Sequence, residues 1–430
     1  MRIAIVNQFY IPDISPTAHL SASLAEGLAA AGHTVSVITS RGGYVPQSKG
    51  SGAGSDAASD GPMVYRIWTP QLGKKSIIKR CIDYASFYLL AAWRMLRLPA
   101  QDVVISLTTP PYIAWTGVMH GWLHPRTKQV LWSMDCYPDA AVRAGVLRKE
   151  GLPARLMHAM NRALFRRLDY LICLDQAMLD LLMGQYAPKR PLPTAVIPNW
   201  ERLSLFPGTG TAGDGGDGRQ STAWDQSGPL GLTGKFVILY MGNAGVGHPF
   251  EAVAEAARRL KDRGVVFLFV GGGKRWPWLE QTRDSQGLTN LIMHPYVPKE
   301  VTGSIMRTAD CALITLRDDM LGVMCPSKLH SYLAMSLPVI YVGPQTSNVD
   351  EAITRFGCGV SLRQGDVEGI IRYIEEATTD SGKLWAQRQM ARHAFETAYC
   401  DKCTLPQFEA ILDRLCGAKQ ARAPAVPEHV

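Results

Sequence analysis

The sequence has little that would suit a membrane-spanning or exported protein. Its most apolar stretch, VVISLTTPPYIAWTGVMHGWL, is interrupted by Pro110 and Pro111, so no segment offers the roughly 18 uncharged apolar residues that a transmembrane helix needs. The first residues, MRIAIVNQFY, form a strand pattern and lack the apolar core and cleavage site of a signal peptide. We therefore expect a cytoplasmic protein.

Disulfides and a metal site are also not indicated. The nine cysteines are scattered, mostly within apolar runs, as is typical of small core residues in a reducing compartment. Cys400 and Cys403 form the one close pair, but no second Cys or His pair completes a zinc site around them. We interpret the pair as part of a helix end, and we expect neither a metal nor another cofactor.

The charge balance narrows the range of partners. Charged residues make up 19% of the chain, and the net charge of +8 suggests an anionic partner. The basic residues do not form a dense run with interleaved aromatics, which is the usual signature of a nucleic-acid binder. Nucleotide phosphates or an acidic membrane surface remain as partners.

Alternation of strand and helix patterns predicts an α/β fold with two parallel, doubly wound sheets. Short β-branched runs alternate with helical patterns from residue 1 to about 206, and the alternation begins again near residue 236. The stretch 207–235 is rich in Gly, Asp, Ser and Thr and cannot bury a core, so we interpret it as the linker between two lobes. Residues 45–62 have the composition of a disordered loop, and 417–430 that of a polar tail.

Residues 74–98 form a long amphipathic pattern with basic residues around Phe87, Tyr88 and Trp93. Such a face could lie on an anionic membrane surface. A helix packed on the first lobe with solvated charges explains the same pattern, and both interpretations stay open.

The first strand of the second half runs into a glycine-rich turn, MGNAGVGH, residues 241–248. Ligands of open α/β sheets bind beyond the carboxyl ends of strands, where loops lead into helices. Gly242 and Gly245 permit close backbone approach, while Asn243 and His248 offer polar groups to a phosphate or a sugar. A flexible strand–helix turn without a ligand is the alternative, and the Gly-Lys-Ser/Thr ending of a Walker loop is absent.

Two further segments of this half are weaker candidates. VGGGKRW, residues 270–276, follows the second strand and would bring the backbone at Gly272 near a ligand. Tyr296, in HPYVP after a third strand, could lie against a flat base, or it could be a core aromatic.

The stretch CPSKLHSYLAMSLPVIYV predicts a turn, a helix from Pro326 to about Leu337, and a buried strand from Val339. Free N–H groups of the first turn, together with Ser327 and Lys328, would attract an anion such as a diphosphate. An ordinary helix with an exposed lysine is the alternative.

In the first half, Ser15 and Thr17 supply capping hydroxyls where a helix begins at about Pro16, and their loop could face a partner site. Asp135 and Asp139 follow the strand KQVLWS. A carboxylate there could orient or deprotonate a hydroxyl. We favour Asp135 for this role and a helix-capping role for Asp139.

Taken together, these segments resemble the retaining glycosyltransferases of family 4, in particular the bacterial subgroup of polysaccharide and colanic-acid-type transferases. The resemblance covers nearly the whole chain, and its specificity comes from the order and spacing of the motifs. These are IVNQFYIPDISPTAHLSASLAEGLAAAGHTVSVITS, WSMDCYPDAAVRAGVL, VIPNW, YMGNAGVGHPFEAV, FLFVGGGKR and PSKLHSYLAMSLPVIYVGP.

The resemblance implies a GT-B fold with an interdomain cleft, an acceptor-binding lobe at 1–206 and a lobe at 236–382 that binds a nucleoside-diphosphate sugar. Helices at 383–416 would cross back to the first lobe. It also implies metal-free, retaining transfer to a glycan, lipid-linked or oligosaccharide, in surface polysaccharide biosynthesis. In such enzymes the glycine turn and the Pro-Ser-Lys segment contact donor phosphates, which would place Gly242, Asn243, Ser327 and the catalytic Lys328 there. The residues themselves add further donor-binding candidates: Gly245, His248, Gly272, Tyr296, Pro326 and Ser331. Asp135 would be the second catalytic residue, and Ser15 and Thr17 would lie on the acceptor side.

The sequence departs from the family pattern at two carboxylates. Many members carry two Glu separated by seven residues, the second on the helix after Pro-Ser-Lys, and here these positions are Val323 and Ser331. The Arg and Lys often found after the first glycine turn are also missing, with His248 and Pro249 near there instead. Some relatives have a small residue at the second position, so we interpret the change as altered donor handling, with loss of activity as the alternative. Ser331 could still bond a hydroxyl.

Three other functions fit the sequence less well. A nucleotide-sugar epimerase can share this two-lobed architecture, and the missing carboxylates are compatible with a non-catalytic nucleotide-sugar-binding protein. A dehydrogenase is the poorest of the three, because GGGKRW is not the dinucleotide fingerprint.

Overall fold

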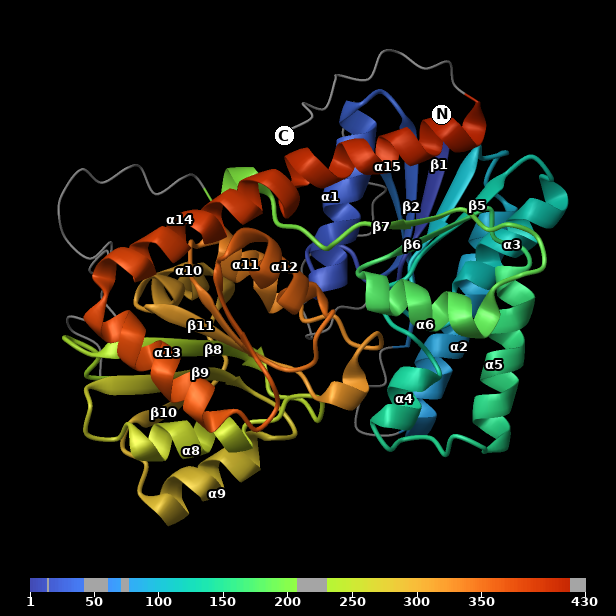
Figure 1. Cartoon of the computed structure of the whole chain (residues 1–430). Helices are drawn as coiled ribbons and strands as arrows, with labels where there is room; N and C mark the ends of the chain where they lie inside the picture. The colour runs from blue at the N-terminus through green and yellow to red at the C-terminus, as the bar shows by residue number, and fades with distance from the viewer. Residues whose placement is uncertain (14, 42–60, 71–76, 207–229, 418–430) are drawn as a thin grey trace.

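The chain folds into two α/β lobes that lie side by side (Figure 1). The structure is a computed structural model that describes residues 1–13, 15–41, 61–70, 77–206 and 230–417. Most of the predicted loop, the predicted linker up to residue 229 and the tail from residue 418 lie outside these ranges.

The first lobe contains a seven-stranded parallel sheet with the order β3-β2-β1-β4-β5-β6-β7. Its strands are β1 (Arg2–Val6), β2 (Thr34–Ser40), β3 (Met63–Ile67), β4 (Val103–Ser106), β5 (Lys128–Trp132), β6 (Tyr170–Cys173) and β7 (Thr194–Val196). Its helices are α1 (Pro16–Ala30), α2 (Ile77–Leu96), α3 (Ala114–Leu123), α4 (Asp139–Arg143), α5 (Leu152–Phe165) and α6 (Gln176–Tyr186), followed by the 3-10 turn η1 (Leu203–Leu205).

The second lobe contains a six-stranded parallel sheet with the order β10-β9-β8-β11-β12-β13. Its strands are β8 (Phe236–Asn243), β9 (Val265–Gly272), β10 (Leu291–His294), β11 (Cys311–Thr315), β12 (Val339–Val342) and β13 (Gly359–Leu362). Its helices are α8 (Glu251–Arg259), α9 (Trp276–Gln286), α10 (Lys299–Arg307), η2 (Asp318–Met320), α11 (Lys328–Ala334), α12 (Asn348–Phe356) and α13 (Val367–Thr379).

The predicted fold class is therefore confirmed: both sheets are parallel and doubly wound. The apolar, β-branched strands are buried on both faces, as parallel sheets require, because their crossover helices cover both sides. Strand order reverses beside β1 in the first sheet and beside β8 in the second, so the loops after these strands diverge and leave room for ligands.

Two long helices follow the second sheet and cross to the first lobe. α14 (Ser381–Ala398) packs against α11, α12 and α13, whereas α15 (Asp401–Cys416) lies along α1 of the first lobe (Figure 1). No helix within the described ranges has the length and apolarity needed to cross a membrane.

An aromatic cluster fixes α15 to the first lobe. The indole rings of Trp132 and Trp200 stack with their centroids 5.3 Å apart, and the Phe408 ring packs edge-on against both, at 4.9 and 5.7 Å. Phe408 is fully buried, and Leu405 of the same helix packs directly against Gly27 of α1, where a larger side chain would clash.

We expect Phe408→Ala to lower the free energy of unfolding of the N-terminal lobe by about 3–5 kcal/mol, because it removes a buried aromatic ring and leaves a cavity. Urea denaturation followed by tryptophan fluorescence measures the change. Trp385→Ala, on the exposed side of α14 with 57% of its side chain accessible, is the control and should change stability by less than about 0.5 kcal/mol. Equal effects of the two substitutions would contradict the packing described here.

Candidate functional site

The glycine-rich edge of the second sheet is built from two paired strands rather than from a strand and a turn. β8 continues through Gly242 and Asn243, which pair with Gly271 and Gly272 of β9. A Cβ atom on Gly271 would lie only 2.1 Å from the carbonyl oxygen of Gly242. The strand therefore extends through Asn243, into the segment 241–248 that the sequence pattern suggested as a turn, and close packing against β8 and Ala244 explains Gly271 and Gly273.

Lys328 points at this edge. Its Cε atom lies 3.1 Å from the place that a Cβ atom on Gly242 would occupy, and its Nζ atom lies 4.6 Å from the centroid of the Tyr240 ring. The structure thus brings together Gly242 and Lys328, which are 86 positions apart in the sequence. A positive charge therefore lies next to a strand end that carries no side chain.

The helix that carries Lys328 is shorter than the sequence suggests. α11 begins at Lys328 instead of Pro326 and ends at Ala334 instead of Leu337. Pro326 and Ser327 precede the helix, and the Ser327 side chain makes no capping hydrogen bond. The early end follows from Ser336, whose φ of 57° is left-handed and cannot continue a helix.

The charge of Lys328 is poorly compensated. Burial lowers the pKa of its ammonium group to about 8, and desolvation is the only contribution to this shift. Within the described part of the chain, no carboxylate lies near enough to offset the cost of burying the cation. An anionic ligand would supply the missing charge.

His248 belongs to the wall of the site instead of its mouth. Only 5% of the residue is exposed, and its Nδ1 atom donates a hydrogen bond to the Thr315 carbonyl oxygen at 2.6 Å. Burial, and secondarily the charge of Lys328, lower its pKa to about 3, so the ring is neutral at physiological pH. Gly245 packs against Asn243 and His248, and these three residues form one compact turn.

Tyr296 provides an exposed flat surface at the same edge. Its ring lies 3.0 Å from the place of a Cβ atom on Gly272, and 63% of the residue is accessible to solvent. The alternative of a core aromatic is therefore wrong. Gly272 and Tyr296 lie together, as the proposed contact with a flat base would require.

In the first lobe, Asp135 lies at the carboxyl end of β5 and lines a small cavity. Its backbone N–H donates to Thr108 Oγ1 at 3.0 Å. The residue is exposed to solvent, but the surrounding protein atoms partly desolvate its carboxylate and raise its pKa to about 6. The other lining residues include Leu107, Pro111, Tyr112, Ser133, Cys136, Tyr137, Asn161 and Phe165.

The other candidate residues of the first lobe, Ser15, Thr17 and Asp139, make polar contacts within that lobe. Ser15 Oγ caps α1 by accepting from the Ala18 N–H at 3.2 Å and lies 3.3 Å from Thr17 Oγ1, so the predicted capping role of Ser15 is confirmed. Asp139 is the first residue of α4, not its cap, and its Oδ1 atom accepts a hydrogen bond from Gln185 at 3.0 Å.

Loops that follow strands of the two lobes meet beside the Asp135 cavity. Arg143 Nη1 donates to the carbonyl oxygens of Asp319 and Leu321 at 2.7 and 2.8 Å. Cys136, next to Asp135, donates from its thiol to the Gly322 carbonyl oxygen at 3.3 Å. The carboxyl ends of both sheets therefore face the same junction.

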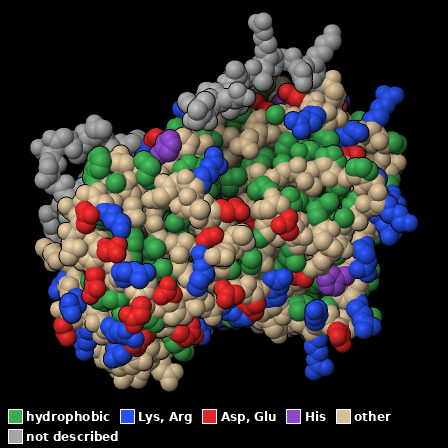
Figure 2. Space-filling view, in the orientation of Figure 1, with side chains coloured by type: hydrophobic (Ala, Val, Ile, Leu, Met, Phe, Trp, Pro, Cys, Tyr) green, Lys and Arg blue, Asp and Glu red, His purple; other side chains and the backbone are tan. Residues whose placement is uncertain are grey.

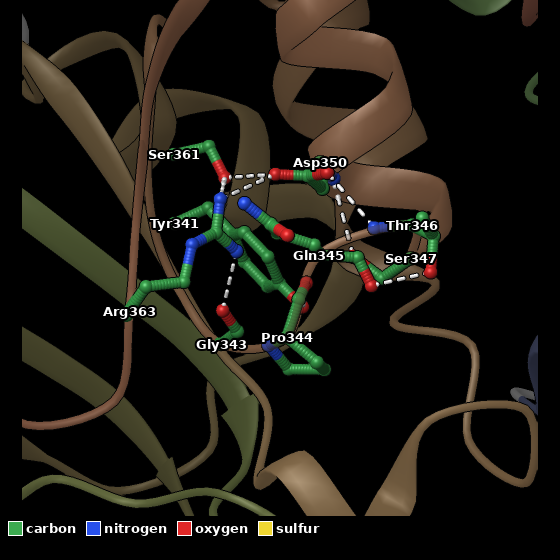
Figure 3. A network of polar contacts seen from close by, with 9 residues as sticks. All are labelled: Tyr341, Gly343, Pro344, Gln345, Thr346, Ser347, Asp350, Ser361 and Arg363. Carbon is green, nitrogen blue, oxygen red and sulfur yellow. Dashed lines mark hydrogen bonds and ion pairs between the residues drawn. The ribbon is translucent and has the colours of Figure 1, made fainter.

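A polar network stiffens another loop at this edge of the second lobe (Figure 3). Arg363 donates to the Gly343 carbonyl oxygen at 2.7 Å and to Asp350 Oδ1 at 2.8 Å. Asp350 also accepts from the Thr346 N–H at 2.9 Å and from the Ser361 hydroxyl. These bonds fix the loop between β12 and α12, and the sequence patterns did not indicate them.

Glu201 is a residue of the junction that sequence reasoning missed. Its Oε1 atom accepts a 2.7 Å hydrogen bond from the Ser331 hydroxyl, across 130 positions of the chain. The only available sequence signal was an acidic residue directly after the motif VIPNW. In the described ranges, no group of three or more His, Cys, Asp or Glu side chains is arranged to hold a metal ion.

Comparison with known proteins agrees with this geometry. Residues 18–200 match the family model described as glycosyl transferase 4-like domain, and residues 235–380 match that of glycosyl transferases group 1. The chain is 24% identical to the protein of Escherichia coli (strain K12) named as the colanic acid biosynthesis glycosyl transferase WcaI, over 88% of this chain and 92% of that protein.

Solved structures show the same fold at low sequence identity. WaaG, described as a glycosyltransferase involved in lipopolysaccharide biosynthesis, matches with a TM-score of 0.65 and 18% identity over 97% of this chain and all of that one. HepE of Anabaena, solved in complex with UDP-glucose, matches with a TM-score of 0.66 and 13% identity over 96% of this chain and all of that one. The two family models, which together cover residues 18–200 and 235–380, and this shared fold show that the chain belongs to the GT4-like glycosyltransferases with the GT-B fold.

Proposed function

We propose that the protein transfers a sugar from a nucleoside-diphosphate sugar to a glycan acceptor, lipid-linked or oligosaccharide, in the biosynthesis of a surface polysaccharide. Transfer would retain the anomeric configuration, would need no metal, and would take place in the cytoplasm. The observation that carries this proposal is the Lys328 ammonium group, which is largely enclosed at a glycine edge without a carboxylate partner. The names of WcaI and WaaG, and the UDP-glucose bound to HepE, support it.

On the donor side, the enzyme has to stabilise a departing diphosphate. Negative charge builds up on this leaving group in the transition state, and a preorganised cation in a water-poor site stabilises it most. Lys328 meets this description, and the absence of a side chain on Gly242 lets phosphate oxygens approach the ammonium group. The exposed face of Tyr296 could then stack on the base.

On the acceptor side, Asp135 is the residue able to orient a hydroxyl or to accept its proton. With a pKa near 6 it is mostly ionised at pH 7 and remains basic enough to take part in proton transfer. Its cavity opens beside the junction where the Cys136 and Arg143 contacts join the lobes. Ser15 and Thr17 lie in the segment after β1, and Asp135 follows β5. Both strands pair with β4 in the parallel sheet, so these residues would contribute to the same surface.

α2 offers a contact with an anionic membrane. Phe87, Ala91 and Met95 of this helix are buried against the sheet, whereas Leu89 and Trp93 are 73% and 51% exposed. Figure 2 shows hydrophobic side chains gathered over the first lobe and Lys and Arg along its outer edge, while charged residues of both signs cover the second lobe. A peripheral position on the inner face of the plasma membrane would bring the enzyme to a lipid-linked acceptor.

A thermal-shift panel of UDP-, GDP- and dTDP-sugars tests the proposed function directly. A donor present at a hundred times its dissociation constant should stabilise the protein by roughly 2.7 kcal/mol. If no member of the panel shifts the melting temperature, the proposed donor class is wrong.

Lys328→Met should lower the transfer activity and raise the stability of the protein. We expect a loss of transfer of about 10²- to 10³-fold, because the diphosphate loses its cation. The same variant should be more stable than wild type at pH 7, by about 1–3 kcal/mol, because the folded state no longer buries a charge. This gain should shrink as pH rises from about 8 towards 10.5, where the wild-type ammonium group is neutral in the folded state. Lys402→Met, at an exposed position, should change neither quantity, and a destabilised Lys328→Met protein would contradict the burial of an unpaired cation.

Asp135→Asn should change the pH dependence of transfer. In wild type, kcat/KM should rise with pH through about 6, as the Asp135 carboxyl group ionises. The variant should lose this acidic limb and about 10²- to 10⁴-fold in rate, the range expected for a catalytic base. Asp139→Asn is the control and should keep the limb; a variant of Asp135 with an unchanged profile would remove this residue from the mechanism.

Membrane contact through α2 can be measured by co-sedimentation with vesicles that contain phosphatidylglycerol. Replacing both Leu89 and Trp93 with Ser should reduce the bound fraction several-fold, because these are the two most exposed large apolar residues of the described part of the helix. The double replacement of Trp385 and Met390 with Ser, on exposed positions of α14, should leave binding unchanged. The same partition for all three proteins would show that α2 is not a membrane surface.

A further inference from the structure

Glu201 is held at the point where both crossing segments of the chain meet. Its backbone N–H donates to the Tyr399 carbonyl oxygen at 3.2 Å, and its carbonyl oxygen accepts from the Asp401 N–H at 3.1 Å. It therefore forms a parallel bridge with Cys400, between α14 and α15. Because the backbone is bound on both sides, the position of this side chain is set by the junction itself.

The side chain extends from this point to the helix that carries Lys328. Glu201 Oε1 accepts the hydroxyl proton of Ser331, with 2.7 Å between the oxygens. Ser331 follows Lys328 by three positions on α11, so both residues are on the same face of the helix, with Cβ atoms about 5–6 Å apart. A carboxylate from outside the second lobe thus lies about one helical turn from the proposed diphosphate site.

One oxygen of this carboxylate is free to bind a ligand. Within the described residues, no hydrogen-bond donor contacts Glu201 Oε2. The nearby cations are engaged elsewhere: Lys299 Nζ lies 3.1 Å from His19 Nε2, and Arg202 forms an ion pair with Glu26 at 2.8 Å. Desolvation raises the pKa of Glu201, while the Ser331 hydrogen bond and the charge of Lys299 oppose the shift. The group is therefore a partly desolvated hydrogen-bond acceptor with unused capacity.

We propose that Glu201 is a donor-recognition residue whose Oε2 atom accepts a hydrogen bond from a hydroxyl of the nucleotide sugar bound at Lys328. A carboxylate accepts from hydroxyl groups and repels phosphate, so it suits the polyol parts of this ligand, either the ribose or the transferred sugar. The inference rests on the proposed function.

The test relocates the carboxylate from one partner of the hydrogen bond to the other. Glu201→Gln keeps the size of the side chain but replaces the accepting oxygen with an NH₂ group, and Glu201→Ala removes it. The double variant Glu201→Ala/Ser331→Glu returns a carboxylate to the same place from α11. Affinity is measured by isothermal titration calorimetry with the panel sugar nucleotide that stabilises the wild type, and folding is checked by the urea midpoint.

We expect Glu201→Ala and Glu201→Gln to weaken binding by about 10- to 100-fold, the loss typical of a hydrogen bond to a charged group. The double variant should recover most of that affinity. Ser331→Ala, which removes only the support of the carboxylate, should lose a few-fold. Titration with the nucleoside diphosphate alone separates the two sources: weakened binding of both ligands assigns the ribose, and weakened binding of the sugar nucleotide alone assigns the transferred sugar.

Two results would overturn the inference. One is unchanged affinity of the Glu201 variants, and the other is a loss that the relocated carboxylate does not restore, which would show that Glu201 only supports the junction. If the wild type itself binds no sugar nucleotide of the panel, the proposed function fails first, and that outcome is distinct from both.

Discussion

The site depends on a cation that the protein encloses without a matching carboxylate. Folding normally avoids such an arrangement, since a buried charge without a partner costs several kcal/mol. Here the Lys328 ammonium group lies against the Tyr240 ring and the bare backbone of Gly242, neither of which neutralises it. An anion bound beside Lys328 would supply the missing charge, which is why the proposed function places phosphates there.

Positioning such a site between two lobes requires that the lobes be held in register. Two kinds of contact do this. The Trp132, Trp200 and Phe408 rings fix α15 to the first lobe by apolar packing, while Arg143 and Cys136 bind loop carbonyls of the second lobe. The aromatic contacts are buried, whereas polar contacts join the lobes at several places: beside the Asp135 cavity, between Lys299 and His19, and between Ser331 and Glu201.

The sequence was sufficient for the features that follow from local periodicity and strand ends. The parallel sheets and the cap at Ser15 were of this kind, whereas the grouping of the Pro-Ser-Lys segment with the glycine edge came only from the family resemblance. The sequence failed where a tertiary contact changes the local outcome: Asn243 extends a strand because β9 pairs with it, and His248 turns inward because Thr315 offers a carbonyl oxygen. The arrangement of Asp350 with Arg363 was equally inaccessible, since neither residue belongs to a recognisable pattern.

The motif around Ser331 contains no carboxylate of its own, but the structure places one beside it, that of Glu201, from 130 positions away in the sequence. A helix residue that is too short to reach a ligand can instead orient a longer side chain from another segment, and the Ser331 hydroxyl does so for Glu201. The carboxylate then belongs to the segment that joins the lobes and not to the lobe that carries Lys328. A ligand bound by both Lys328 and Glu201 would link the second lobe to the junction. Its binding would then favour the relative position of the lobes in which both residues reach it, so ligand binding and lobe position would be coupled.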